Sequence, residues 1–599
     1  MCKKNEIKSK RFIFEIMKTY SVIIVGALII FLFHIHYLFL STRNVPFMDY
    51  WRVLKDFGEK IMTNNLALRD FWSPINGQRP GLMLFLLAIN MRLFGYNTQI
   101  EIFGGAIIKL FISIILIYTF IKENRDKQIQ NFKIQILCLS FLVAIFNLNQ
   151  WEIITLEFSL SYMIRLFCFI FIFIYLSHCL LNMNNYKNHL YYISILLIPI
   201  ICLISSALFA PFVGSICTVV FINFCINYKK ERLLYFKNYL VLFFSIVFGA
   251  SIYLYNIGSL LVLGEKIKIG TLLINFIKGT LIMFGTSLVF IENNFKLLYT
   301  LGIIIALLYL LAIFLFFKKE MYKKTYIPLF LILYNFLYIS IIYYGRGLHF
   351  NHLYLAASRY TTETTLGLIG ILWIFLNVIL EEINFKTIVK RNYLRISSIS
   401  VSLIIIGLIT TIYFESKIGP YRGKLFEICK NILLKIDYTS DDELSIFQDA
   451  YGSVRIGVDI LKKYNLGIFR TNKINPNPNI NNDLIFYKGF YENKNKEVWI
   501  NGNASIAIKN LSAKKFILYG YCPEMMPSNY ITVSINNNES VSAEIIPGDS
   551  YKIEVDFENT DGLIYINIKT EKTVIPKNEG WNEDVRELGA FIISWELVE

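Results

Sequence analysis

The chain has 599 residues, which leaves room for a large helical bundle and a second domain. Hydrophobic residues make up 55% of it and charged residues 17%, which excludes an ordinary soluble globular protein and indicates that lipid surrounds much of the chain. The net charge of +15 does not indicate nucleic-acid binding, because the Lys and Arg residues stand in short clusters between apolar runs.

The N-terminus is basic and precedes an apolar run over residues 20–40. This run is longer than the h-region of a signal peptide and lacks a small-residue cleavage site, so we expect an uncleaved signal anchor. Of the nine cysteines, six lie inside apolar runs and none has CxxC spacing. Neither a disulfide framework nor a zinc site is therefore expected.

About eleven apolar segments are long enough to cross roughly 30 Å of hydrocarbon. The predicted spans are 19–41, 100–122, 134–150, 161–182, 190–208, 210–228, 238–257, 298–317, 325–345, 362–381 and 396–415.

The connections between these spans alternate in charge. Basic clusters stand at 3–11, 122–133, 229–237, 318–324 and 386–395. Under the positive-inside rule these clusters are cytoplasmic, so the N-terminus is predicted inside and the C-terminal region outside.

Two further apolar segments do not fit this alternation as spans. Residues 81–95 are short and contain Asn90 and Arg92, so an interfacial helix on the outer surface is expected. Residues 271–291 are long enough to cross, but a crossing would place the basic cluster at 318–324 outside. A re-entrant or surface-lying helix is expected there.

The fold class that follows is a polytopic α-helical membrane protein with an extracytoplasmic all-β sandwich at its C-terminus. Residues 1–415 form the membrane domain, in which 42–99 is the first outer loop, and residues 416–475 read as a helical linker. Residues 476–599 contain short alternating runs punctuated by Gly, Asn, Asp and Pro, which is typical of a β-sandwich of the jelly-roll kind.

The strongest catalytic candidate is Asp49, in the sequence RNVPFMDYWR directly after the first span. A carboxylate at the membrane–water boundary is costly to desolvate and by default marks a functional site. The alternative is a solvated acid that caps the following helix. Glu152, Glu157 and Asp70 are further acids near the same boundary that could support Asp49.

Several basic residues at the outer boundary could hold a phosphate. Arg79 precedes the interfacial helix, and a guanidinium there can bind a phosphate bidentately or simply anchor the helix to lipid headgroups. The sequence GRGLHFNHLYLAASRYTTETT adds further candidates, Arg346, His349, His352, Arg359 and Tyr360. The two His residues lack a third ligand at a suitable spacing, so no metal site is predicted.

Taken together, these motifs resemble the GT-C class of integral membrane glycosyltransferases. PFMDYWR, with Asp49 and Trp51, followed by SPINGQRPGLMLFLLAINMRLFG, is similar to bacterial membrane proteins with PFWDxW and then HNEHR. Asn76 and Arg79 match the second motif, whereas Gly77 and Gln78 replace its acid and its His. The segment SRYTTETT resembles a later Arg-Tyr motif, and PKNEGWNEDVRELG is similar to carbohydrate-binding-like sandwiches.

The resemblance implies transfer of a sugar from a polyprenyl-phosphate donor to a glycan or glycolipid acceptor outside a bacterial cytoplasmic membrane. Asp49 would then be the base, and Arg79, Arg359 and Arg346 would bind the donor phosphate. No cofactor is expected, because no phosphate-binding loop or nucleotide motif is present. One alternative is a transporter for a lipid-linked saccharide, which the scarcity of acids in the spans disfavours. The other is an inactive glycan-binding membrane protein.

Overall fold

The structure, a computed structural model, describes most of the chain. The described residues are 20–74, 79–124, 131–182, 187–227, 236–255, 269–289, 294–347, 352–382, 388–434, 436, 439–470, 484–491, 498–510, 514–536, 539–558, 562–581 and 584–598.

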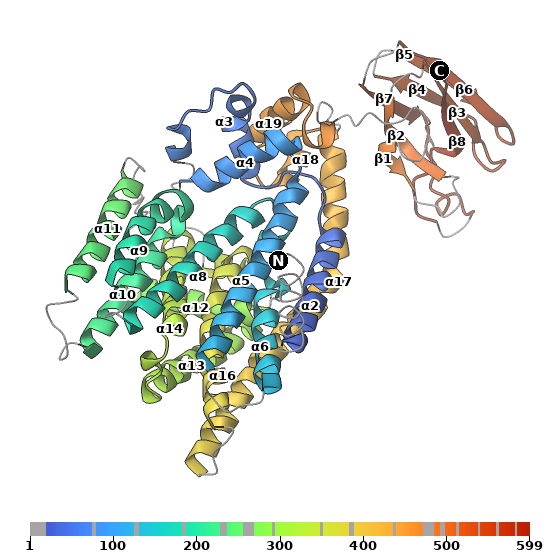
Figure 1. Cartoon of the computed structure of the whole chain (residues 1–599). Helices are drawn as coiled ribbons and strands as arrows, with labels where there is room; N and C mark the ends of the chain where they lie inside the picture. Colours follow the sequence, from blue (N-terminus) through green and yellow to red (C-terminus); the bar gives the residue numbers. More distant parts are fainter. Residues whose placement is uncertain are drawn as a thin grey trace, which may run out of the picture. The chain divides into compact units, whose positions relative to one another are not determined.

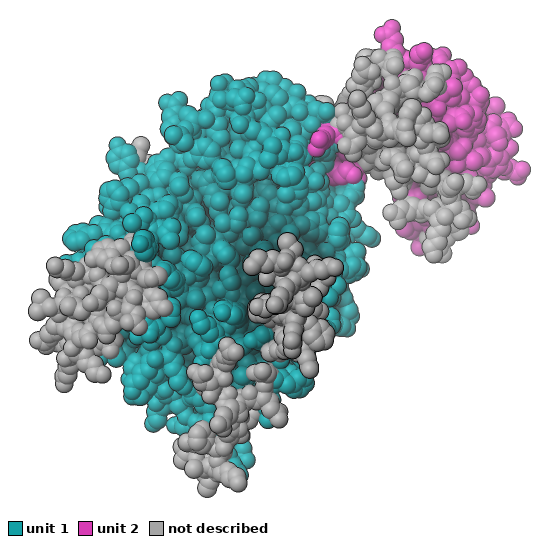
Figure 2. All heavy atoms as spheres, in the orientation of Figure 1, with its two compact units in different colours: residues 1–427, 445–468 teal, residues 428–444, 469–599 magenta. Residues whose placement is uncertain are grey.

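The chain divides into two compact units, coloured in Figure 2. Unit 1 comprises Met1–Glu427 and Ser445–Ile468, and unit 2 comprises Ile428–Leu444 and Phe469–Glu599. The segment 416–475, expected as a separate linker, is thus shared between the units. The helix α17 runs without interruption from Ile388 to Leu434, so the long helix continues past residue 415.

Unit 1 is a helical bundle (Figure 1). Its long helices are α2 (Ser21–Ser41), α5 (Thr98–Asn124), α6 (Asn131–Ile145), α8 (Ser159–Leu181), α9 (Lys187–Pro199), α10 (Phe209–Asn227), α11 (Phe236–Leu254), α12 (Ile269–Leu288), α13 (Phe295–Lys318), α14 (Ile327–Ile342), α16 (Thr361–Glu382) and α17.

Nine helical segments among the described residues are long and apolar enough to cross a membrane, which indicates a membrane protein. They are Ser21–Ser41, Thr98–Asn124, Phe132–Ile154, Ser159–Leu181, Phe209–Ile226, Phe295–Lys318, Ile327–Gly347, Ser358–Glu382 and Arg391–Leu434. The predicted spans 190–208 and 238–257 correspond to shorter apolar helices, Tyr192–Ile204 and Tyr239–Leu254.

The helices differ in what surrounds them. The most apolar stretch of α16 is 100% buried, against 17% for α2. Helix α16 packs against α6, α12, α13 and α14, which explains why an apolar sequence on all its sides is buried by protein. The apolar side chains of α2, such as Leu28 and Ile29, are exposed and would face lipid.

One end of the bundle carries α3 (Tyr50–Met62), α4 (Gly81–Phe94), α7 (Trp151–Ile154) and α19 (Tyr451–Lys463), and we call it the loop end (Figure 1). Helix α3 is amphipathic and packs on α19. The Trp51 ring lies 5.5 Å from the Phe447 ring, and Arg52 pairs with Asp449 at 2.9 Å. A Cβ at Gly457 would lie 2.7 Å from Trp51, so only glycine fits there.

Helix α12, which covers the second segment that did not fit the charge pattern, contacts loop-end elements near both of its ends. The carbonyl of Leu272 accepts from Tyr343 at 3.0 Å, and the carbonyl of Ser287 accepts from Asn149 at 2.7 Å. The expectation of a re-entrant or surface-lying helix stays a prediction.

Unit 2 contains one antiparallel sheet. Its strands are β1 (Leu484–Phe490), β2 (Val498–Asn510), β3 (Lys515–Tyr521), β4 (Asn529–Ile535), β5 (Glu539–Ile545), β6 (Ser550–Asp556), β7 (Gly562–Thr570) and β8 (Ala590–Val598).

The strand order is β5-β4-β7-β2-β8-β3-β6, with β1 paired to β2. The end strands β5 and β6 contact one another, so the sheet is nearly closed around an apolar core that includes Ile506, Ile531 and Ile566. The all-β prediction is confirmed, but the strands form one continuous sheet where two separate sheets were expected.

Candidate functional site

Asp49 stands at the first position before α3, and its side chain is exposed. The carboxylate makes no capping hydrogen bond to the helix, so the geometry does not support the capping alternative. Within the described part of the chain we find no hydrogen bond or ion pair to this carboxylate. Asp49 is therefore open to a ligand at the loop end.

The main chain on both sides of Asp49 is held firmly. The amide of Phe47 donates to Glu157 Oε1 at 2.8 Å, and the amide of Met48 donates to the carbonyl of Phe447 at 3.1 Å. Met48 has a φ of 53°, a left-handed conformation that is rare outside glycine. An exposed side chain on a fixed, strained main chain is typical of a functional position.

Arg359 lies in the short 3-10 turn Ser358–Tyr360, directly before α16, and is partly exposed. Its guanidinium is 3.5 Å from Glu152 Oε1, and its amide donates to Glu152 Oε2 at 2.8 Å. The guanidinium also lies over the rings of Tyr354 and Tyr360 and donates to the hydroxyl of Tyr354. The aromatic rings hold the arginine in place while part of it remains open to solvent.

Two more cationic groups gather in the same region. Arg346 lies within electrostatic range of Tyr360, and Lys278 is exposed and acts on His352. Burial, followed by the charge of Lys278, lowers the pKa of His352. The region around Tyr360 is thus rich in positive charge, with Glu152 as its paired acid.

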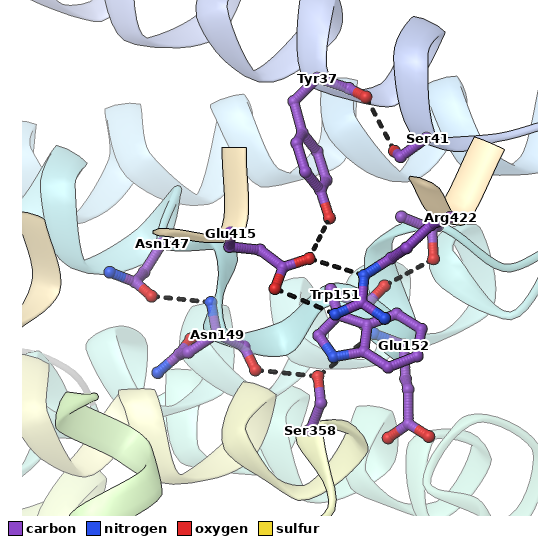
Figure 3. A network of polar contacts seen from close by, with 10 residues as sticks. Tyr37, Ser41, Asn147, Asn149, Trp151, Glu152, Ser358, Glu415 and Arg422 are labelled. Carbon is purple, nitrogen blue, oxygen red and sulfur yellow. Dashed lines mark hydrogen bonds and ion pairs between the residues drawn. The ribbon is translucent and has the colours of Figure 1, made fainter. Parts of the chain in front are cut away.

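A polar network holds Glu152 beside Ser358, the residue before Arg359 (Figure 3). The hydroxyl of Ser358 donates to the carbonyl of Asn149 at 2.8 Å and accepts from the amide of Glu152 at 3.2 Å. Next to it, the Arg422 guanidinium lies 3.4 Å from the centre of the Trp151 ring. The network is therefore rigid around the site.

Arg422 is itself held by an acid and a phenol. It pairs with both oxygens of Glu415, at 2.7 and 3.0 Å, and Tyr37 donates to Glu415 at 2.8 Å (Figure 3). A bidentate pair of this kind fixes orientation as well as distance. Helices α2 and α17 thereby brace the turn that carries Glu152.

Asp49 and Arg359 are attached to the same short turn. Glu157 binds the main chain beside Asp49, and Glu152 binds Arg359. Five residues of backbone reach at most about 18 Å even when fully extended, and part of this turn is helical. Residues 152–157 are therefore tied at one end to Arg359 and at the other to the segment that precedes Asp49.

Arg79 takes a different position from the one expected for a phosphate ligand. It is 2% exposed and donates to the carbonyls of Tyr253, at 2.6 Å, and of Tyr255 and Trp72. Two of these carbonyls belong to the end of α11, where backbone groups lack helical partners. Arg79 therefore caps a helix, and no contact joins it to Asp49 or Arg359 among the described residues.

The side chains of two other predicted site residues also have partners within the fold. Trp51 is fully buried between α3 and α19, so it shapes the loop end without reaching a ligand. Asp70 pairs with Lys60 at 2.9 Å and accepts from the amide of Ala67 at 2.8 Å. The hydrogen bond from Lys60 lowers the pKa of Asp70. Asn76, Gln78 and His349 lie outside the described residues.

Sequence reasoning missed charged groups buried inside the bundle. Arg165 and Glu363 form an ion pair at 2.6 Å, and Tyr334 donates to Glu363 at 2.7 Å. Lys109 and His34 are also buried, without a hydrogen-bond partner in the structure. The available signal was a charged residue within an apolar run, which is rare in membrane helices and marks a special position.

Among the described residues, no group of three or more His, Cys, Asp or Glu side chains is arranged to hold a metal ion. Comparison of the chain with protein families, with curated proteins and with solved structures found no match.

Proposed function

We propose that this protein is a glycosyltransferase of the GT-C type, which moves a sugar from a polyprenyl-phosphate donor to a glycan or glycolipid acceptor at the outer face of a bacterial cytoplasmic membrane. The observation that carries the proposal is the open carboxylate of Asp49, in a chain that also holds a partly open, preoriented Arg359. Glu157 binds the segment before Asp49, and Glu152, five residues earlier, binds Arg359. An anionic lipid headgroup and a polar acceptor could meet there.

In this proposal Asp49 is the general base. It takes the proton of an acceptor hydroxyl while that oxygen forms a bond to the anomeric carbon of the sugar. The bond between the anomeric carbon and the phosphate oxygen breaks, and the polyprenyl phosphate leaves with the electron pair. An exposed carboxylate without an ion-pair partner in the described chain suits this role because it is free to accept the proton.

The leaving phosphate gains negative charge, which the cations of the same region would stabilise. Arg359 is oriented in advance by Glu152 and by two aromatic rings, so little reorganisation is needed when charge develops. Arg346 lies nearby and adds a second positive charge. A phosphate would compete with Glu152 for part of the Arg359 guanidinium.

Unit 2 would bind the acceptor glycan. Trp499, Phe591 and Tyr521 are directly paired across β2, β8 and β3, so their half-buried rings share one face of the sheet. Arg586 lies over the ring of Tyr491, whose amide donates to the carbonyl of Trp499. The rings suit the apolar faces of a saccharide, and the charged side chain of Arg586 beside them suits its hydroxyl groups.

The test is the change Asp49→Asn in the full-length protein in proteoliposomes. The assay measures release of label from polyprenyl-phosphate sugars labelled in the sugar, with an envelope-polysaccharide extract as acceptor. We expect a loss of about 10²–10⁴-fold, because a general base contributes that much. Asp56, exposed on the same helix, provides the matched control Asp56→Asn, which should keep full activity. Full turnover by Asp49→Asn would remove Asp49 from the reaction.

A second candidate function is transport of a lipid-linked saccharide across the membrane. It gains support from Lys109 and Arg165, two cations buried within apolar helices, which sequence analysis did not weigh. Movement of a fluorescent polyprenyl-linked saccharide between leaflets of proteoliposomes would support transport. Sugar transfer without such movement would rule it out.

A further inference from the structure

We propose that two buried acids, Glu157 and Glu101, act as a clamp that positions Asp49 by holding the residues on either side of it. This inference rests on the proposed role of Asp49. Neither acid reaches a ligand, since each is 1% exposed. They are positioning residues, and their effect on the site passes through the main chain.

Glu157 holds the N-terminal side of Asp49. Its Oε1 accepts from the amide of Phe47 at 2.8 Å, two residues before Asp49. Phe47 and its amide are buried, so the amide would lack a partner without this carboxyl group. The bond joins segments 110 residues apart in sequence and is not part of any helix or strand.

Glu101 holds the C-terminal side of Asp49. Its Oε2 accepts from the hydroxyl of Tyr50, the residue directly after Asp49, at 2.5 Å. Its Oε1 accepts from Asn90 at 2.6 Å, and Asn90 also binds the main chain of Asn97 in both directions. Glu101 thus ties the start of α3 to the end of α4 and the start of α5.

The two carboxyl groups are close enough to interact. Glu101 acts electrostatically on Glu157, and both act on Tyr96 and Tyr50. Burial, with a smaller contribution from the charge of Glu101, raises the pKa of Glu157 to about 8. Glu157 Oε2 and Tyr96 Oη are buried without hydrogen-bond partners in the structure, which leaves Oε2 able to carry the proton.

A neutral Glu157 still accepts from the amide of Phe47, so the clamp is closed at neutral pH. When the pH rises past about 8, Glu157 ionises beside Glu101 in a buried site. The acids, phenols and amide named here are the groups that face it, and none of them brings a positive charge. The clamp should therefore loosen above that pH.

The test measures where residue 49 stands without any need for turnover. In full-length protein in nanodiscs, D49C and, separately, D56C are labelled with a membrane-impermeant maleimide, and the peptide carrying each site is quantified by mass spectrometry. Asp56 lies on the exposed side of α3 and gives the reference rate. The quantity compared is the ratio of the D49C rate to the D56C rate.

We expect Glu157→Ala to change this ratio about fivefold, which corresponds to the loss of one buried hydrogen bond. Glu157→Gln keeps the acceptor oxygen and should leave the ratio unchanged at pH 7. Glu157→Gln keeps Glu101, the second acid of the clamp, which also titrates. Above pH 8 the ratio should shift more with Glu157 than with Glu157→Gln. The same ratio in all variants at every pH would overturn the clamp.

If Glu157→Ala does not fold, the test rests on the labelling ratio alone, measured across pH 6–9 in the protein with Glu157 and in the Glu157→Gln variant. The result is also separable from the proposed function. If the labelling ratio changes in the Glu157 variants and Asp49→Asn keeps full turnover, the clamp stands and Asp49 is not the general base. Unchanged labelling together with loss of turnover by Asp49→Asn would do the reverse.

Discussion

Arg79 and Arg359 have similar sequence settings and opposite structural ones. Each directly precedes an apolar helix, and the sequence predicts a phosphate ligand at both. In the structure Arg79 is buried against three backbone carbonyls, two at the end of α11 and one at Trp72. Arg359 is partly open, with one acid and two rings around it.

The difference shows that an arginine's partners decide its role. Backbone carbonyls cannot move away, so the donors of Arg79 are committed to the fold. A carboxylate at 3.5 Å is a weak partner by comparison and can share the guanidinium of Arg359 with an anion. The same residue type therefore stabilises the bundle at one position and is available for a ligand at the other.

The variant Arg359→Met tests the contrast between the two arginines most strongly. We expect sugar transfer to fall about 10²–10³-fold, because a preorganised cation at the leaving phosphate is removed. The unfolding midpoint should stay close to that of the unchanged protein, since Arg359 is partly exposed. Transfer at the normal rate would mean that Arg359 does not hold the donor.

Arg79→Met should give the opposite result. Loss of hydrogen bonds from a cationic group to three buried carbonyls should lower the free energy of unfolding by about 3 kcal/mol. Turnover per folded molecule should stay within a factor of about two, because no contact to the site is lost. Denaturant titration of purified protein measures the first quantity, and activity per folded protein measures the second. A stable but inactive variant would return Arg79 to the site.

The smallest expected effect concerns unit 2. Trp499→Ala should weaken sedimentation of the full-length protein with envelope polysaccharide about tenfold, in line with the loss of one aromatic contact. Tyr530→Ala is the control, because Tyr530 is 45% exposed on β4 and is not part of the ring set. Equal losses in both variants would indicate a general effect on the sheet and no specific glycan surface.

Much of the fold could be predicted because the membrane constrains sequence strongly. A helix that crosses hydrocarbon needs an unbroken apolar run, so all eleven predicted spans coincide with apolar helices, nine of them long enough to cross. Strands were visible through alternation, as in YITVSINN, which covers all of β4 except its first residue. The strand order was not, because pairing β2 with both β7 and β8 depends on contacts far apart in sequence.

The site was predictable only in part. Asp49, Glu152 and Arg359 were identified by their predicted position at the membrane boundary, and the structure shows Glu152 paired with Arg359 and Glu157 bound to the segment before Asp49. The hydrogen bond from Arg79 to the carbonyl of Tyr253 could not be predicted from the spacing of residues in the sequence. The same holds for the bond from Glu157 to the amide of Phe47, because no local pattern encodes it.

The central claim is that a lipid-linked phosphate binds at the loop end between Asp49 and Arg359. A cryo-EM structure of the full chain in nanodiscs loaded with a polyprenyl phosphate tests it most directly. We predict phosphate density within hydrogen-bond distance of the Arg359 guanidinium, with the Asp49 carboxylate facing the space next to it. A phosphate bound at the opposite end of the bundle, or against Arg79 with Arg359 unchanged, would contradict the claim.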